Sequence, residues 1–210
     1  MSEKPEFVRV DPHNELVIKL TFNPGEDMLR AQLTGASDVV GRILAARELA
    51  DTGKRKNLRA IADVYPDEDF WGVRASWVTA LSKAGTQTAM ETVLELAEVE
   101  SDPMVLETLI RALGRFQDPA VADKVAAMID VGLPYRARQA AYEVLGAQRD
   151  EAQWEILIQG AAAQEFAAFP QAAATRRLAA PRRAEAVSVL IDDSAPHPGT
   201  DRRVRASAPR

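Results

Sequence analysis

Four stretches, ARELAD (residues 46–51), WVTALSK (77–83), IRALGRF (110–116) and YEVLGAQ (142–148), align on a shared leucine. The aligned leucines are Leu49, Leu81, Leu113 and Leu145, so successive copies are 32 residues apart throughout the series. The residues four before, nine after and twelve after each leucine are apolar in every copy. A fixed period of this length indicates a tandem structural repeat rather than a single irregular domain.

Each repeat is expected to form two helices. Val105, Leu109 and Leu113 follow the spacing that is typical of an amphipathic helix. A second, shorter helix is expected after a turn, as at residues 121–129 and 153–159. Repeated helix pairs stack into an α-solenoid, in which each pair buries its apolar face against its neighbours. Residues that favour helix N-caps occupy the column twelve before the leucine: Ser37, Asp69 and Ser101.

The regions outside the repeat divide the chain into three predicted parts. In residues 1–24, Leu16, Ile18, Leu20 and Phe22 share one face and alternate with Val17, Lys19 and Thr21 on the other, after the turn signal at 11–14, which predicts a β-hairpin over residues 7–22. We expect this part to be the hairpin or the end of a β-sandwich-like segment. Residues 25–192 are expected to hold the helical repeats. Residues 193–210 are rich in arginine and proline and are expected to be disordered.

The composition argues against most enzyme classes. The chain of 210 residues has no cysteine and only two histidines, His13 and His197. A thiol nucleophile, a Cys-ligated metal, a His-based metal cluster and a Ser/His/Asp triad are therefore not expected. We predict no cofactor and no metal. No apolar run is long enough to cross a membrane and the first residues are charged, so we expect a cytoplasmic protein that does not enter membranes.

The charge is unevenly distributed. The net charge is −5, but the segment 176–210 carries eight arginines against four acidic residues, a net of +4. The segment 1–175 therefore carries the balance of −9. An acidic body disfavours binding to nucleic acid, and the basic tail lacks the interleaved aromatic side chains that stack on bases.

Several segments together resemble the M1 (aminopeptidase N-like) metallopeptidases. They are VRVDPHNELVIKLTFN (8–23), EDMLRAQL (26–33), DVVGRILAARELA (38–50) and DEDFWGVRASWVTAL (67–81), within a resemblance over about residues 6–165. In that family such a stretch spans the end of a small β-sandwich and the start of the C-terminal HEAT-like helical domain. The resemblance thus implies an all-α fold, a HEAT-like α-α superhelix with a short N-terminal β-hairpin.

The catalytic residues of the M1 family have no counterpart in this sequence. Its enzymes bind zinc through an HExxH motif, whereas His13 is followed by Asn14, Glu15 and Leu16 with no second histidine four positions on. Without two histidines on one helical face there is no zinc to activate water. We therefore expect a non-catalytic domain that is part of, or derived from, a zinc aminopeptidase.

An arginine recurs seven positions before the aligned leucine in three of the four repeats. Arg42, Arg74 and Arg138 occupy this column, and Leu106 stands there in the third repeat. Such a row of guanidinium groups could bind the carboxylates of a partner protein. Alternatively, each arginine pairs with an acidic side chain of the adjacent repeat, an interpretation that we favour.

Two aromatic residues share the column ten before the leucine. Trp71 and Tyr135 stand at expected helix starts, where they could anchor a partner protein or pack against the preceding turn, the interpretation that we favour.

Acidic residues gather at 67–69 and at Glu95, Glu98, Glu100 and Asp102. Neither group follows a calcium-binding pattern, so we expect solvated helix faces or caps.

The leading functional hypothesis is a HEAT-repeat domain for protein–protein or interdomain packing, with an M1-type catalytic domain as one possible partner. Arg42, Arg74, Arg138, Trp71 and Tyr135 are the candidate partner-binding residues. The first alternative is a freestanding HEAT-repeat scaffold that binds an unrelated protein through its concave face. A HEAT-fold enzyme acting on nucleic acid is the third hypothesis, and the acidic body argues against it.

Overall fold

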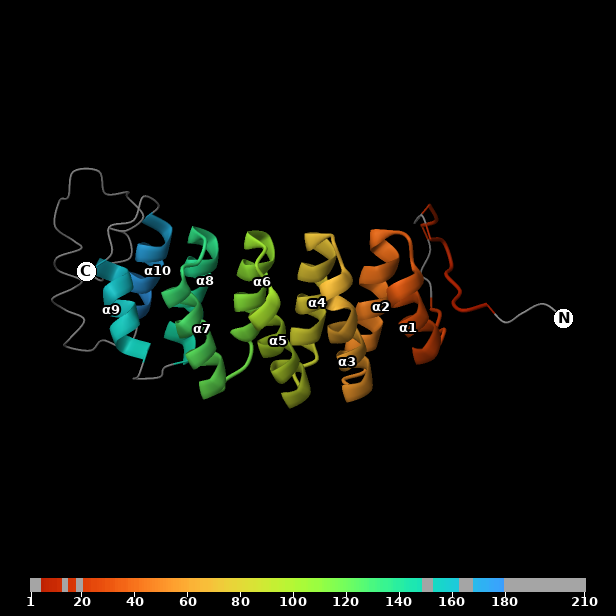
Figure 1. Ribbon diagram of the computed structural model, residues 1–210, viewed down its shortest axis with the longest axis horizontal. Coiled ribbons are helices and arrows are strands. Elements are labelled where there is room, and N and C mark those ends of the chain that lie inside the picture. Colours follow the sequence, from red (N-terminus) through yellow and green to blue (C-terminus); the bar gives the residue numbers. More distant parts are fainter. Residues whose placement is uncertain (1–4, 13–14, 18–20, 149–152, 163–167, 180–210) are drawn as a thin grey trace. The chain divides into compact units, whose positions relative to one another are not determined.

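The computed structural model describes residues 5–12, 15–17, 21–148, 153–162 and 168–179. These residues contain ten α-helices and one short 3-10 helix (Figure 1). The helices are α1 (Glu26–Gly35), α2 (Val39–Asp51), α3 (Arg55–Val64), η1 (Tyr65–Asp67), α4 (Trp71–Lys83), α5 (Gln87–Val99), α6 (Pro103–Leu113), α7 (Pro119–Val131), α8 (Tyr135–Gln148), α9 (Trp154–Ala162) and α10 (Ala168–Ala179).

The predicted repeat corresponds to pairs of helices. The first helices of the four repeats are α2, α4, α6 and α8, and the second helices are α3, α5, α7 and α9. Contrary to the expectation from the sequence, the second helix is not consistently shorter, because α5 and α7 are as long as α2 and α4. Gly146, although glycine often follows the end of a helix, lies inside α8.

The chain divides into two compact units, residues 1–100 and 101–210. In the first unit α2 packs beside α4, while α1, α3 and α5 form a second layer against them (Figure 1). In the second unit α8 packs between α6 and α10, and both α8 and α10 contact α9. Both units are thus built from two layers of helices, the arrangement that stacked helix pairs produce.

The aligned columns form the core of each unit. All four aligned leucines are at most 1% exposed, and the residues four positions before them are buried to the same degree. The column twelve after the leucine is buried as well, ending at Leu157. Trp154 differs from its column because it is only partly buried. The leucine column would continue at position 177, and Leu178, one position later, is fully buried in α10.

Aspartates cap α2 and α6, one position later than the sequence pattern predicts. The side chain of Asp38 accepts a hydrogen bond from the Gly41 N–H, and that of Asp102 accepts one from the Met104 N–H. Ser37 and Ser101 therefore precede the caps rather than forming them. In the second repeat Phe70, not Asp69, occupies the cap position, and its N–H donates to the Glu68 carboxylate at 3.0 Å. In each case a carboxylate accepts a backbone N–H near a helix start, where intrahelical partners are missing.

The described residues of the segment 7–22 contain no strand, so the expected β-hairpin is not observed there. Residues 13–14 and 18–20 of that segment lie outside the described residues. At Asp11, the first residue of the expected turn, the carboxylate accepts the N–H groups of Glu15 and Leu16 at 2.9 Å. Phe7 packs against Gly35 of α1, and Arg9 forms an ion pair with Asp38. Phe7 and Arg9 thus hold the start of the segment against α1 and the start of α2.

The predicted tail at residues 193–210 lies outside the described residues. Within the part of the chain that the structure describes, no helix combines the length and the apolar character needed to span a membrane.

Candidate functional site

Arg42 and Arg74 each bind a glutamate at the same sequence separation. Arg42 donates to both Glu68 carboxylate oxygens, at 2.6 and 3.2 Å, and Arg74 donates to both Glu100 oxygens, at 3.0 and 3.5 Å. The glutamate side chains are only 6% and 3% exposed. Such two-point pairing fixes the geometry of both partners. Each pair links the first turn of a first helix to the end of the second helix or the segment that follows it.

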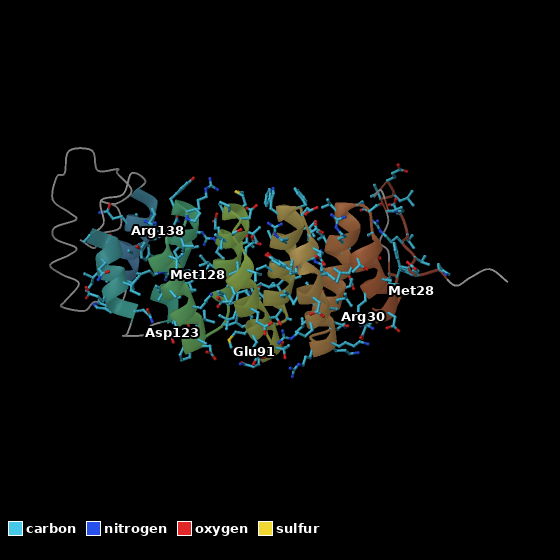
Figure 2. All side chains as sticks on the ribbon, viewed as in Figure 1. Met28, Arg30, Glu91, Asp123, Met128 and Arg138 are labelled. Atoms are coloured by element: carbon cyan, nitrogen blue, oxygen red, sulfur yellow. The ribbon has the colours of Figure 1, made fainter. Side chains whose placement is uncertain are left out.

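The same guanidinium groups also bind backbone carbonyls of the segment that precedes their own helix. Arg42 donates to the carbonyls of residues 36 and 37, at 3.1 and 3.2 Å, and Arg74 to those of residues 68 and 69, at 2.8 and 3.1 Å. Arg138, on α8 (Figure 2), donates to the equivalent carbonyl of Leu133 at 3.1 Å. The guanidinium groups of Arg42 and Arg74 are therefore occupied rather than open to a partner, but each ion pair joins two parts of one repeat instead of the two adjacent repeats that we expected.

The third repeat lacks both members of this pair. Leu106 replaces the arginine, and Gly132 stands where Glu68 and Glu100 stand in the first two repeats. Loss of both partners together avoids leaving one charge buried without a counter-charge, which is the costly alternative. The pairing could have been predicted from the sequence, because the glutamates recur with the same period as the leucines.

Trp71 and Tyr135 occupy the first positions of α4 and α8, where they are 41% and 48% exposed. Trp71 contacts the exposed Phe70, with ring centroids 5.7 Å apart. Arg136 donates to the Tyr135 hydroxyl at 3.0 Å. Both candidate anchors thus keep a large solvent-facing surface. Trp71 lies in the first unit and Tyr135 in the second.

A cleft of about 450 Å³ lies in the first unit beside the start of α4. Its lining includes the Arg42–Glu68 pair, the carboxylate-bearing Asp67 and Asp69, and the exposed ring of Phe70. Leu33, Val64 and Trp77 add apolar surface. Trp77 is 1% exposed, and its indole N–H donates to the Arg42 carbonyl at 3.2 Å. The cleft thus combines an apolar wall with excess negative charge.

Comparison with known protein families gives a match to HEAT repeats over residues 26–105 and again over residues 70–146. Together these matches span more than half of the chain. The chain belongs to the HEAT-repeat family. No curated protein matched the sequence.

Several acidic groups of this HEAT-repeat protein serve as ion-pair partners and helix caps. Glu95 pairs with Arg59, Asp102 caps α6, and Glu100 accepts the Tyr65 hydroxyl at 2.5 Å in addition to binding Arg74. Burial and the Glu100 carboxylate raise the pKa of Tyr65, so its hydroxyl stays protonated and donates. Among the described residues no group of three acidic or histidine side chains is arranged to hold a metal ion.

The sequence pattern does not predict the cleft of the HEAT-repeat protein, although its residues stand out separately. Asp67, Glu68 and Asp69 form an acidic run, and Phe70 directly precedes Trp71. Their assembly with Leu33 of α1 depends on how α1, η1 and α4 pack, which a linear pattern does not specify. The only local signal is a set of acidic residues next to two consecutive aromatic ones.

Proposed function

We propose that the protein is a non-catalytic HEAT-repeat domain that binds another protein through the N-terminal ends of its first helices. The observation that carries this proposal is the exposure of large apolar side chains at the start of the first helix in all four repeats, while the aligned core columns are buried. Exposed apolar and aromatic groups are typical of protein-binding surfaces. These side chains are Val40, Trp71, Met104 and Tyr135, each between 40% and 49% exposed.

Of the five candidate residues, Trp71 and Tyr135 fit this role best. The guanidinium groups of Arg42 and Arg74 are engaged by glutamates and carbonyls. Rigid aromatic side chains lose little conformational entropy on binding and often supply much of the affinity of an interface. Arg42 and Arg74 would then hold the starts of α2 and α4 to the ends of their own repeats, so that Trp71 is presented at a fixed position within the first unit.

We further propose an M1-type aminopeptidase catalytic domain as the partner. The support is the resemblance of residues 26–33, 38–50 and 67–81 to the C-terminal helical domain of that family. In such enzymes the helical domain packs against the catalytic domain. The alternative is a freestanding scaffold that binds an unrelated protein, and the identity of the partner distinguishes the two.

A pull-down with matched variants tests the proposal. The tagged chain is compared with Trp71→Ser/Tyr135→Ser and with the control Val99→Ser/Val131→Ser, which removes exposed apolar side chains from the second helices α5 and α7. We expect the partner to be lost only with the aromatic pair. A zinc aminopeptidase without its own helical tail supports the M1 relation, and an unrelated protein supports the scaffold. Equal capture by all three chains, or none by the wild type, would contradict the proposed surface.

A further inference from the structure

The cleft beside the start of α4 has two carboxylates without a partner among the described side chains. Asp67 ends η1 and Asp69 precedes the N-cap of α4, and both side chains are exposed. Nearby, the Arg42 guanidinium is fully engaged, since each of its nitrogens donates to Glu68 or to the carbonyls of residues 36 and 37. The Arg42–Glu68 pair is neutral, so the two aspartates leave the cleft with an excess charge of about −2.

The rest of the lining is apolar and aromatic. Val64 contributes partly exposed aliphatic surface over the buried Leu33, and Phe70 adds an exposed ring that contacts Trp71. A cleft of about 450 Å³ suits one or two side chains and is too small for a folded domain. Carboxylates beside an aromatic face favour a cation with an apolar stem, because the cation gains from both the charges and the ring. The negative charge and the aromatic surface therefore both favour an organic cation.

A metal ion does not meet these conditions. The described carboxylates are not grouped to hold one. An aliphatic and aromatic wall also offers a bare divalent ion no oxygen ligands, which calcium and magnesium require. An organic cation uses the whole lining, since its stem covers the apolar wall while its head reaches the aspartates.

We propose that this cleft binds the arginine side chain of a partner protein, with the guanidinium held by Asp67 and Asp69 and its stem packed against Phe70. This inference rests on the proposed function, because it specifies which side chain of the bound protein contacts the proposed surface. Arginine fits better than lysine, because its planar guanidinium can donate to two carboxylates and stack on a ring. The bound segment would carry apolar residues on either side of the arginine, to cover Val64 and Trp71.

The test uses the full chain and two labelled peptides that differ in one group. One peptide has an arginine between two leucines, and the other has citrulline, which keeps the shape and removes the charge. We expect the arginine peptide to bind about tenfold more tightly, the factor that about 1.4 kcal/mol of charge-dependent binding provides. Fluorescence anisotropy measures the affinity, and the indole N–H signal of Trp77 in an NMR spectrum reports binding at the cleft. That signal should shift while the signal of Trp154, which lies in the other unit, does not.

Matched variants distinguish binding at the cleft from a general attraction of the peptide to the acidic residues of the chain. Asp67→Asn/Asp69→Asn should weaken binding of the arginine peptide about tenfold. Glu48→Gln/Asp51→Asn removes the same charge from exposed positions on α2 and should change the affinity less than about twofold. All four residues are exposed, so circular dichroism should show that both variants stay folded. Equal binding of the two peptides, equal effects of the two variants, or no binding of the arginine peptide would overturn the proposal.

Failure of this inference is distinguishable from failure of the proposed function. If the tagged chain captures its partner through Trp71 and Tyr135, and Asp67→Asn/Asp69→Asn captures it equally well, protein binding stands and the arginine site is overturned. If the aromatic variants capture the same proteins as the wild type, the proposed surface itself fails. In that case the peptide measurement alone tests whether the cleft binds arginine.

Discussion

Arg74 and Arg59 make the same type of ion pair in two different environments. Arg74 pairs with Glu100, which is 3% exposed, whereas Arg59 pairs with Glu95, which is 53% exposed. Removing one member of a buried pair leaves an uncompensated charge in a poorly solvated place, while exposed pairs contribute little. The chain thus provides its own control for the value of a buried arginine–glutamate pair.

We predict that Arg74→Leu lowers the free energy of unfolding by about 3 kcal/mol, and that Arg59→Leu lowers it by less than about 1 kcal/mol. Urea denaturation followed by circular dichroism measures both. The double variant Arg74→Leu/Glu100→Gln should recover part of the loss, because no full charge then stays buried. Equal costs for the two single variants would show that burial gives the Arg74–Glu100 pair no special importance for stability.

Residue-level chemistry was only partly predictable from the sequence. The period identified the arginine column and the buried leucines, because both repeat in a linear pattern. The cap of α2 was placed one position early, since Ser37 and Asp38 are both good capping residues and the backbone geometry decides between them. The cleft stayed hidden, because Leu33, Asp67 and Phe70 meet only after three elements have packed.

At the scale of single helices, the start of α2 depends on Asp38. Its carboxylate accepts the Gly41 N–H and binds Arg9, and these two interactions lower its pKa below the ordinary value of 3.8. A carboxylate whose pKa is lowered by folding contributes stability above its unfolded pKa and loses that contribution as the pH falls through the folded pKa. The contribution is below about 1 kcal/mol, because the side chain is 44% exposed.

We therefore predict that Asp38→Asn is less stable than the wild type at pH 7 and that the difference shrinks as the pH falls below about 3.8. Asparagine can still cap the helix, so the difference reports the charge rather than the cap. Thermal unfolding of both proteins across this pH range measures it. A difference that stays constant with pH would assign the effect to packing instead.

The packing of α9 on α8 depends on Gly160. A Cβ atom added there would lie 2.5 Å from the Tyr142 ring of α8, far inside van der Waals contact. We predict that Gly160→Ala lowers the free energy of unfolding by about 1–3 kcal/mol, because the helix or the ring must move. Gln159→Ala, at the exposed neighbouring position, is the control and should be near neutral. Denaturant titration of the two variants gives the comparison.

At the scale of the whole molecule, the main packing contacts within each unit join helices of the same repeat or of adjacent repeats. In such proteins stability is close to a sum of local terms, so a lesion in one place weakens its surroundings more than distant parts. This property separates repeat proteins from globular domains with a single core. Because each repeat makes similar local contacts, the sequence period predicted the helical-repeat architecture, whereas the overall amino-acid composition did not.

We predict that Trp77→Ala, which empties a fully buried site in the first unit, lowers the free energy of unfolding by about 3–5 kcal/mol. Hydrogen exchange should accelerate in α2 to α5 and stay close to wild type in α8 to α10, because the lost contacts lie in residues 1–100. Leu145→Ala is the converse experiment, since Leu145 is buried in α8 of the second unit. Uniform acceleration over both units would mean that the chain unfolds as one cooperative body. Local acceleration would instead allow the binding end of one repeat to be altered with little cost to the others, which is the property a protein-binding scaffold requires.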